Sequence, residues 1–290
     1  MTKRVALVTG GSSGIGERTA IRLHEAGFEV YAVARRVERM QGLAEAGVHV
    51  FAMDVTEDAS MTDGVQQVLT DAGRIDVLVN NAGYGSYGAV EDVPIEEARR
   101  QFEVNVFGLA RLTQLVTPGM RERAADPLAQ RSRIVNISSI GGKFYEPLGA
   151  WYHATKFAVE GFSDSLRVEL APHGIDVVII EPGPIRTEWG EISRQGLEES
   201  ARGGAYEQQA RQVSRMLAWA DGRLVGGSPD AVARKVVVAV QSNTPRARYP
   251  VGRGAGTIVR ARRLLPDAAY DYLVKAAYGV PGRGRRPDAG

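Results

Sequence analysis

The chain has 290 residues, of which 44% are hydrophobic and 24% are charged, so it is long and apolar enough to bury a substantial core. Its formal net charge of +2 is nearly neutral for this size and gives no support to a nucleic-acid partner. The chain contains no cysteine, which excludes disulfides, thiolate metal sites and a cysteine nucleophile.

No segment of the sequence predicts export or insertion into a membrane. The apolar run at residues 5–8 is interrupted at Gly10 and Gly11, too early for a signal peptide. The longest apolar runs, residues 177–180 and 236–240, are much shorter than the roughly 18 residues that a membrane span requires. We therefore expect a cytoplasmic protein with no membrane span and no nucleic-acid partner.

Short apolar runs rich in β-branched residues recur along the chain and predict strands that are buried on both faces. These runs are residues 5–8, 30–33, 48–53, 75–79, 134–137 and 177–180. Longer stretches with helical spacing lie between them, at residues 15–26, 98–117 and 154–170. The alternation predicts an α/β fold with a doubly wound parallel sheet of the Rossmann type, in one domain, with its ligand crevice beyond the C-terminal ends of the strands.

The regular alternation stops after Pro184. Residues 186–227 are polar and contain several glycines, together with Trp189, Tyr206, Met216 and Trp219. A structureless segment of this length is unusual inside a domain, so we expect a partly helical lid over the crevice. Helical spacing returns at residues 231–240, and residues 248–251 predict a further strand.

Arginines are concentrated toward the end of the chain. They are Arg246, Arg248, Arg253, Arg260, Arg262, Arg263, Arg283, Arg285 and Arg286. A solvated face followed by a flexible tail, at about residues 280–290, is the usual reason for such a concentration. We assign no function to these arginines.

A glycine-rich turn directly follows the first predicted strand and precedes a helix. Its sequence is Thr9-Gly10-Gly11-Ser12-Ser13-Gly14-Ile15-Gly16. Side chains in place of these glycines would block both the tight turn and the approach of a pyrophosphate to the backbone amides at the positive end of the helix. Some glycine-rich turns only connect a strand to a helix, but this combination of strand, turn and helix favours a dinucleotide site.

The end of the second predicted strand indicates which dinucleotide is bound. The strand ends in Ala34-Arg35-Arg36, where an NAD site usually offers an Asp or Glu to the ribose hydroxyls. A guanidinium instead holds a 2′-phosphate through paired charge-assisted bonds, so Arg35 indicates NADP(H). The alternative is that both arginines are ordinary surface residues. At the end of the third strand, Asp54, followed by Val55, could accept a hydrogen bond from the adenine amino group or cap the next helix.

Tyr152 and Lys156 stand four residues apart at the start of a predicted helix, so both side chains share one face. A free tyrosine has a pKa of about 10, and an adjacent ammonium favours its phenolate form. Lowering this pKa by about three units requires roughly 4 kcal/mol, which Lys156 and an oxidised nicotinamide could supply in a dry crevice. By itself, however, this spacing is common on helices.

Other polar clusters fall at the ends of neighbouring strands, and the fold would gather them in the same crevice. They are Asn80-Asn81-Ala82-Gly83, Ser138-Ser139 and Pro182-Gly183. With the glycine-rich turn and the Tyr-x-x-x-Lys pair, they occur in the order and at the intervals that resemble the short-chain dehydrogenase/reductase family, over about residues 3–187. The stretch at residues 80–94 and the helix with Asn105 look like the branch that contains 17β-hydroxysteroid and retinol dehydrogenases.

The resemblance implies a role for each matching residue. Tyr152 would be the general acid and base, giving a proton to the carbonyl oxygen while hydride arrives from the nicotinamide. Ser139, thirteen residues earlier, would hydrogen-bond the same oxygen, with Ser138 as its rival. Lys156 would hold the nicotinamide ribose as well as tune Tyr152, and Asn105 would keep a water in a proton relay.

Residue patterns and resemblance together give one set of cofactor-binding residues. They are Gly10, Ser12, Ser13, Gly14, Ile15, Gly16, Arg35, Arg36, Asp54, Val55, Asn81, Ala82, Gly83, Tyr152, Lys156, Pro182, Gly183, Ile185 and Thr187. Within this set, Ile185 and Thr187 match positions that fix the carboxamide. His153 is interpreted as a helix-surface residue, and the four scattered histidines predict no metal site.

We therefore expect an NADP(H)-dependent oxidoreductase that interconverts a ketone or aldehyde and an alcohol, with an apolar, lipid- or steroid-like small molecule as its substrate. The side chains that suit such a substrate are Tyr84, Tyr87, Phe144, Tyr145, Pro147, Trp151, Trp189, Met216 and Trp219. The alternative is a catalytically silent NADP(H)-binding sensor, against which the complete set of proton-transfer residues argues. The resemblance also implies a homodimer or homotetramer, with the helices of Asn105 and Lys156 as the common dimer face.

Overall fold

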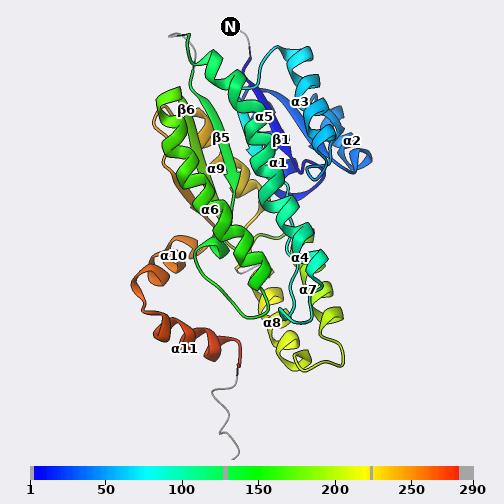
Figure 1. The fold of residues 1–290 in the computed structure, drawn as a ribbon, viewed down its shortest axis with the longest axis vertical. Helices are drawn as coiled ribbons and strands as arrows, with labels where there is room; N and C mark the ends of the chain where they lie inside the picture. Colours follow the sequence, from blue (N-terminus) through cyan, green and yellow to red (C-terminus); the bar gives the residue numbers. More distant parts are fainter. Residues whose placement is uncertain (1–2, 127–129, 223–224, 281–290) are drawn as a thin grey trace, which may run out of the picture.

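The computed structural model describes residues 3–126, 130–222 and 225–280. A sheet of seven strands lies at its centre, in the order β3-β2-β1-β4-β5-β6-β7, and every neighbouring pair is parallel (Figure 1). The strands are β1 (Val5–Thr9), β2 (Glu29–Ala34), β3 (His49–Ala52), β4 (Val77–Asn80), β5 (Ser132–Ile137), β6 (Ile175–Pro182) and β7 (Arg248–Val251). The strand order reverses between β1 and β4, which is where a doubly wound sheet opens its ligand crevice.

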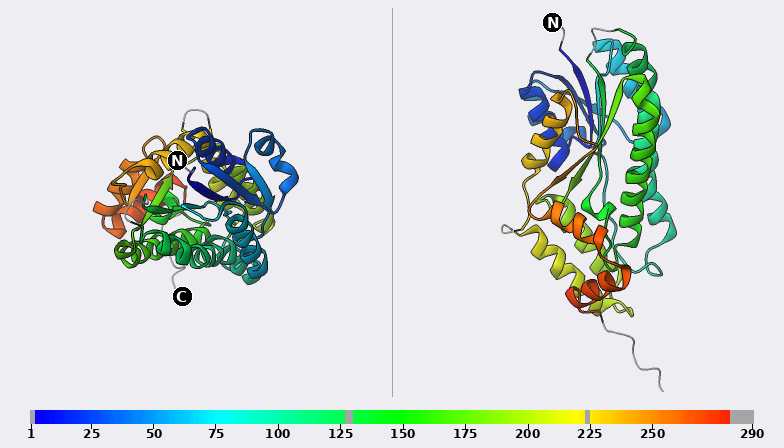
Figure 2. Two further views of the ribbon diagram at one scale, coloured as in Figure 1. Left: turned by 90° about the horizontal axis from the view of Figure 1, so that it is seen from above. Right: turned by 90° about the vertical axis from the view of Figure 1, so that its left-hand side faces the viewer.

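Helices cover both faces of this sheet in two layers (Figure 2). One face carries α1 (Gly14–Glu25), α2 (Gln41–Glu45) and α9 (Pro229–Gln241), and the other carries α3 (Asp58–Ala72), α5 (Gly108–Arg123) and α6 (Ala150–Leu170). Between β4 and α5 lie α4 (Ile95–Phe102) and the π-helical segment η2 (Glu103–Phe107). Three short 3-10 segments complete the layers, η1 (Val37–Met40), η3 (Ile140–Gly142) and η4 (Ala171–His173).

The predicted strands are confirmed, with one difference in burial. All five residues of β1 and all six of β5 are buried, as expected for parallel strands covered by helices on both faces. In contrast, none of the four residues of β3 is fully buried. The expectation of a strand buried on both faces is therefore wrong for β3, because this strand forms one edge of the sheet.

Four helices lie beyond the C-terminal ends of the strands, in the lower part of Figure 1. They are α7 (Glu188–Ser200), α8 (Glu207–Asp221), α10 (Ala255–Leu264) and α11 (Asp267–Ala277). The first two fall within residues 186–227, so the expected helical content of this segment is confirmed. Thr187 begins α7 as its N-cap, with its hydroxyl accepting a hydrogen bond from the Trp189 amide at 3.3 Å. The sequence had not predicted α10 and α11.

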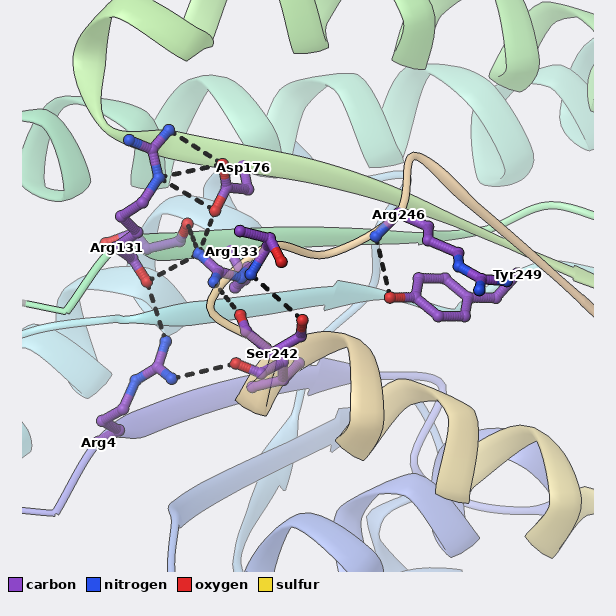
Figure 3. A network of polar contacts seen from close by, with 10 residues as sticks. Arg4, Arg131, Arg133, Asp176, Ser242, Arg246 and Tyr249 are labelled. Carbon is purple, nitrogen blue, oxygen red and sulfur yellow. Dashed lines mark hydrogen bonds and ion pairs between the residues drawn. The ribbon is translucent and has the colours of Figure 1, made fainter.

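At the opposite, N-terminal edge of the sheet, arginines connect β1, β5 and β6 to the end of α9 (Figure 3). Arg4 donates to the Val240 carbonyl at 3.2 Å, and Arg133 donates to the Ser242 carbonyl at 2.6 Å and pairs with Asp176. Burial lowers the pKa of both arginines. Since the carbonyls at a helix C-terminus carry partial negative charge, these guanidiniums cap α9 and fasten it to the sheet.

The expected flexible tail lies outside the described residues, except for Val280. Within the described ranges, no helix is sufficiently long and apolar to span a bilayer, and no cluster of histidine and carboxylate side chains has the arrangement of a metal site.

Candidate active site

A cavity of about 1060 Å³ opens beyond the C-terminal ends of the strands. The glycine-rich turn, the ends of β2 through β6, the first turns of α6, and helices α7, α8, α10 and α11 all contribute to its walls. All the expected cofactor residues line it except Gly16, and Ser138 and Ser139 line it as well. The fold thus brings together residues that are spread over most of the chain.

The glycine-rich turn has the geometry that a pyrophosphate requires. Gly10 has a φ of +69°, and a Cβ added there would lie 2.8 Å from the Asn81 amide nitrogen. A Cβ on Gly16 would lie 2.1 Å from the Gly10 carbonyl oxygen, so this glycine lets α1 start directly against the turn. The N-cap of α1, Ser13, forms no side-chain capping bond, which leaves the first amides of the helix available to an anion. These features fit a bound dinucleotide.

A second turn, after β4, is fastened to the glycine-rich turn. The Asn81 side chain donates to the Thr9 carbonyl at 2.9 Å. In return, the Thr9 hydroxyl accepts hydrogen bonds from the amides of Asn81 at 3.0 Å and Ala82 at 2.9 Å. The Asn-Asn-Ala-Gly motif therefore holds the two turns in register beside the cavity, and the Asn81 side chain is used for this purpose.

Arg35, Arg36 and Asp54 lie together along the cavity near the ends of β2 and β3. Both arginine side chains are exposed, and neither forms an ion pair within the part of the chain that is described. Asp54 Oδ1 accepts hydrogen bonds from the Thr56 amide at 2.9 Å and from the Thr56 hydroxyl at 2.8 Å. Asp54 thus closes the turn before α3, while the N-cap of that helix is Glu57.

Tyr152 lies in the first turn of α6 and is buried. Its hydroxyl is hydrogen-bonded to the Ser139 hydroxyl, which also accepts from the Gly141 amide at 3.0 Å. The neighbouring Ser138 hydroxyl is also buried but has no hydrogen-bond partner among the described residues. Of the two serines considered from the sequence, Ser139 is the one that reaches Tyr152.

Burial governs the ionisation of Tyr152 and Lys156 in the protein alone. Burial raises the pKa of Tyr152 to about 12, against an opposing effect of the hydrogen bond from Ser139. Burial also lowers the pKa of Lys156 to about 8, and its amine donates to the Ile137 carbonyl at 3.0 Å. In the protein alone, loss of hydration dominates the pKa of Tyr152. The lowering of this pKa by Lys156 together with an oxidised nicotinamide stays a prediction.

Asn105 lies behind the cavity and does not line it. The residue is 2% exposed, in the π-helical segment η2. Its side chain donates to the Tyr84 carbonyl at 2.8 Å and the Thr155 hydroxyl at 3.1 Å, and accepts from the Tyr84 amide at 3.0 Å. Asn105 therefore connects the loop after β4 to α6. These hydrogen bonds do not test the expected water relay, which stays a prediction.

Aromatic side chains surround Tyr152. The rings of Tyr87 and Trp189 have their centres 5.7 and 5.1 Å from that of Tyr152. A Cβ on Gly85 would lie 2.3 Å from Trp189 Cζ2, so only glycine allows Trp189 to take this position. Trp189 of α7 thus forms part of the wall around the Tyr152 phenol.

His153 is buried, so its interpretation as a helix-surface residue is wrong. Its Nδ1 lies 2.8 Å from the Gly141 carbonyl, and its Nε2 lies 3.3 Å from the Glu146 amide nitrogen. A Cβ on Gly149 would lie 2.9 Å from the His153 ring. The loop before α6 folds back over this side of the helix, a contact that helical periodicity does not reveal.

The C-terminal helices close another side of the cavity, and one of their arginines, to which we assigned no function from the sequence, takes part in the contact. The Arg262 guanidinium lies over the rings of Tyr145 and Tyr270, at 5.3 and 4.8 Å. The Tyr145 hydroxyl donates to Asp271 at 2.8 Å, and the Tyr270 hydroxyl donates to the Tyr145 carbonyl at 3.1 Å. The only sequence signal for this docking is the presence of tyrosines among the arginines near the end of the chain.

Comparison with known proteins identifies similar chains. A family model described as short chain dehydrogenase matches residues 4–198. A 3-ketodihydrosphingosine reductase from Bacteroides thetaiotaomicron is 33% identical over 97% of this chain and 100% of its own length. An NADPH-dependent 3-dehydrocapnine reductase from Ornithobacterium rhinotracheale is 34% identical over 93% of this chain and 95% of its own.

Solved structures show the same architecture. A short-chain dehydrogenase from Streptomyces avermitilis is 32% identical, covers 97% of this chain and 100% of its own, and has a TM-score of 0.78. The cofactors of similar structures differ. An actinorhodin polyketide ketoreductase is 33% identical, covers 88% of this chain and 97% of its own, has a TM-score of 0.72, and holds NADPH. A 3-ketoacyl-(acyl-carrier-protein) reductase from Brucella melitensis is 28% identical, covers 87% of this chain and 98% of its own, has a TM-score of 0.72, and holds NADH.

Proposed function

Because the chain belongs to the short-chain dehydrogenase/reductase family, we propose that it is an NADP(H)-dependent oxidoreductase that interconverts a ketone or aldehyde and an alcohol, with Tyr152 as its general acid and base. One observation carries the proposal. The hydrogen-bonded hydroxyls of Tyr152 and Ser139 line the same cavity as Lys156 and the glycine-rich turn. A protein that only binds a dinucleotide has no need of this arrangement.

The protonation of Tyr152 suits carbonyl reduction. When bound, the reduced nicotinamide dinucleotide supplies the hydride that no side chain can provide. With a pKa of about 12, Tyr152 is protonated at neutral pH and can give its proton to the carbonyl oxygen. Ser139 holds the same oxygen as negative charge develops on it. Lys156, when protonated, stabilises the phenolate that remains.

The dinucleotide is held along the cavity from the turn to the lid. The bare amides at the start of α1 would bind the pyrophosphate, and Arg35 with Arg36 would bind a 2′-phosphate. Lys156 would hold the nicotinamide ribose, and the stretch from Ile185 to Thr187 would bind the carboxamide. The absence of an acidic residue at the end of β2 supports the preference for NADP(H).

The substrate is an apolar, lipid- or steroid-like carbonyl compound. The part of the cavity beyond Tyr152 is lined by apolar side chains of four helices, namely Trp189, Ile192, Met216, Leu217, Trp219, Ile258, Leu273 and Val274. Similarity to proteins named as 3-ketodihydrosphingosine and 3-dehydrocapnine reductases supports the reduction of a ketone.

A panel of apolar ketones and secondary alcohols, followed through the NADPH absorbance band, tests this function. We expect turnover by the wild type and a loss of about 10²-fold or more in Tyr152→Phe, because the proton donor is removed. Tyr272→Phe, at a tyrosine that is 73% exposed, is the matched control and should keep full activity. Tight NADPH binding without turnover of any compound would instead favour the sensor.

We also infer a homodimer or homotetramer that uses α6 and the helix containing Asn105. Phe107, Phe157 and Val168 belong to these helices and are exposed to 55%, 46% and 70%. Large apolar side chains exposed on neighbouring helices are typical of protein interfaces. A cytoplasmic location remains a prediction.

A further inference from the structure

A carboxylate stands in the cavity close to Tyr152. The Glu146 side chain is 9% exposed and lines the cavity. Its Oε1 accepts a hydrogen bond from the Tyr87 hydroxyl at 2.7 Å, and its Oε2 accepts one from the Tyr278 hydroxyl. The Tyr87 ring packs in turn against the Tyr152 ring, so the Glu146 carboxylate lies one aromatic side chain away from the proposed proton donor.

The histidine beside this carboxylate contacts backbone groups through both ring nitrogens. His153 Nε2 lies 3.8 Å from Glu146 Oε1, a distance at which a protonated imidazole would form an ion pair. However, the Gly141 carbonyl can only accept, so His153 Nδ1 must carry a proton and donate to it. The Glu146 amide can only donate, so Nε2 must be the unprotonated nitrogen. These two backbone contacts account for the orientation of the His153 ring without an ion pair to Glu146.

The Glu146 carboxylate has hydroxyl partners but no permanently charged cation beside it within the described ranges. No lysine or arginine of the described ranges forms an ion pair with it. Burying a carboxylate without a cation is costly, and two tyrosine hydroxyls could be satisfied as well by a neutral amide. A purely structural role in docking Tyr278 thus explains the hydrogen bonds of Glu146 but leaves its charge unexplained.

We propose that Glu146 binds a positively charged amino group of the substrate, so that the enzyme acts on amino ketones or amino alcohols that carry an apolar chain. This proposal rests on the oxidoreductase function proposed above and names the class of substrate on which the enzyme acts. The carboxylate supplies the cation site, since each oxygen keeps a free acceptor position beside its one tyrosine bond. Its position near Tyr152 requires the amino group to be close to the reacting carbon, and the apolar side chains of α7, α8, α10 and α11 accept the chain.

Turnover of a matched pair of alcohols tests this proposal. The probes are 2-aminodecan-3-ol and decan-3-ol, which differ only in the amino group, followed by reduction of NADP⁺. We expect the wild type to prefer the amino alcohol in kcat/KM by about 30-fold or more, as for other desolvated charge pairs. Glu146→Gln keeps a hydrogen-bond acceptor for the tyrosines but removes the charge, so it should abolish this preference while retaining turnover of decan-3-ol.

Tyr278→Phe is the control variant, because it removes one hydrogen bond to Glu146 and leaves the charge. It should keep the preference for the amino alcohol. Equal turnover of both alcohols by the wild type would overturn the ammonium site and leave the oxidoreductase function intact. If Glu146→Gln lost kcat/KM for both alcohols to the same extent while its NADPH binding was unchanged, Glu146 would have only a structural role.

Binding measurements separate this inference from the proposed function. Calorimetric titration with octylamine and octan-1-ol, in the presence of NADPH, involves no turnover, because neither compound contains a carbonyl group that could be reduced. If neither alcohol is oxidised, the proposed function fails for this class of substrate, and the titration still decides the role of Glu146. Octylamine should bind the wild type about 30-fold more tightly than it binds Glu146→Gln, and octan-1-ol should not distinguish them. Equal octylamine binding by both proteins would contradict the ammonium site.

Discussion

Burial acts on Tyr152 and Lys156 in the same sense, because it favours the neutral form of each. The pKa of the phenol rises from 10.0 to about 12 and that of the amine falls from 10.5 to about 8. The phenol is thereby prepared to donate a proton at neutral pH, whereas the amine is still charged but destabilised. The two residues proposed to act together therefore affect the stability of the fold differently at pH 7.

Replacing Lys156 by Met should stabilise the ligand-free protein at pH 7. The difference between pKa values of 10.5 unfolded and about 8 folded corresponds to about 3 kcal/mol at a pH below both. Between these values the unfolded chain binds more protons, so the stability of the wild type should rise with pH from about 8 to 10.5. Urea unfolding at about pH 7 and about pH 9.5 measures both effects.

Lys235, an exposed lysine on α9, provides the control variant for this experiment. Lys235→Met should leave the pH dependence of the wild type in place, whereas Lys156→Met should flatten it. If the free energy of unfolding of Lys156→Met fell at pH 7 instead, the amine would be stabilising the fold, and the assigned cost of its burial would be wrong.

Arg35 should determine the choice of cofactor. Arg35→Asp removes a charge-assisted bond to the 2′-phosphate and adds repulsion, so NADPH affinity should fall by about 10- to 100-fold while NADH affinity is kept or improved. Fluorescence titration with both dinucleotides measures the change. Arg99→Asp, at an exposed arginine on α4, is the control. Unchanged NADPH affinity in Arg35→Asp would return Arg35 to the role of a surface residue.

At the scale of elements, α10 and α11 depend on a few polar and aromatic contacts. None of the residues of α11 is fully buried, and α10 buries only Ala255. Their attachment includes Arg262, Tyr270 and Asp271, which contact Tyr145 in the loop before α6. Tyr278, the C-cap of α11, adds a hydrogen bond to Glu146 in the same loop. Because so little apolar surface is buried, these helices are expected to be among the least stable elements of the fold.

Arg262→Ala should therefore loosen this wall of the cavity. It removes two cation–π contacts, each worth about 0.5–1 kcal/mol at a partly exposed site, and the ion pair with Asp267 at the start of α11. We expect faster amide hydrogen exchange over α10 and α11 and a several-fold higher KM for apolar substrates, with little change in NADPH affinity. Arg260→Ala, at an exposed arginine of the same helix, should change neither. Equal exchange in both variants would show that other contacts hold these helices.

At the scale of the whole molecule, the two layers of helices leave different surfaces to solvent. Phe107 and Phe157 are exposed on the side of α5 and α6, and Val238 is exposed on α9 across the sheet. We expect an interface between copies of the chain to cover the first surface. Its formation would also support α6, and with it Tyr152 and Lys156.

Phe157→Glu should shift the protein toward monomers. A charge at the centre of an apolar interface costs several kcal/mol when it has no partner, which is enough to weaken association by about 10²-fold or more. Light scattering coupled to size-exclusion chromatography measures the mass of each species. Val238→Glu, on the opposite layer, should leave that mass unchanged. A monomeric wild type would contradict the predicted assembly.

The sequence by itself determined the alternation of strands and helices up to β7, the glycine-rich turn, and the meeting of Tyr152, Lys156 and Ser139 at one crevice. These features follow from local spacing, and from the rule that parallel strands present their C-terminal ends at one edge. The tertiary structure decided the exposure of β3, the burial of His153, the raised pKa of Tyr152, and the position of Glu146 beside Tyr278. Each of these depends on contacts between residues distant in sequence or on the loss of water around them, and neither periodicity nor motif spacing contains that information.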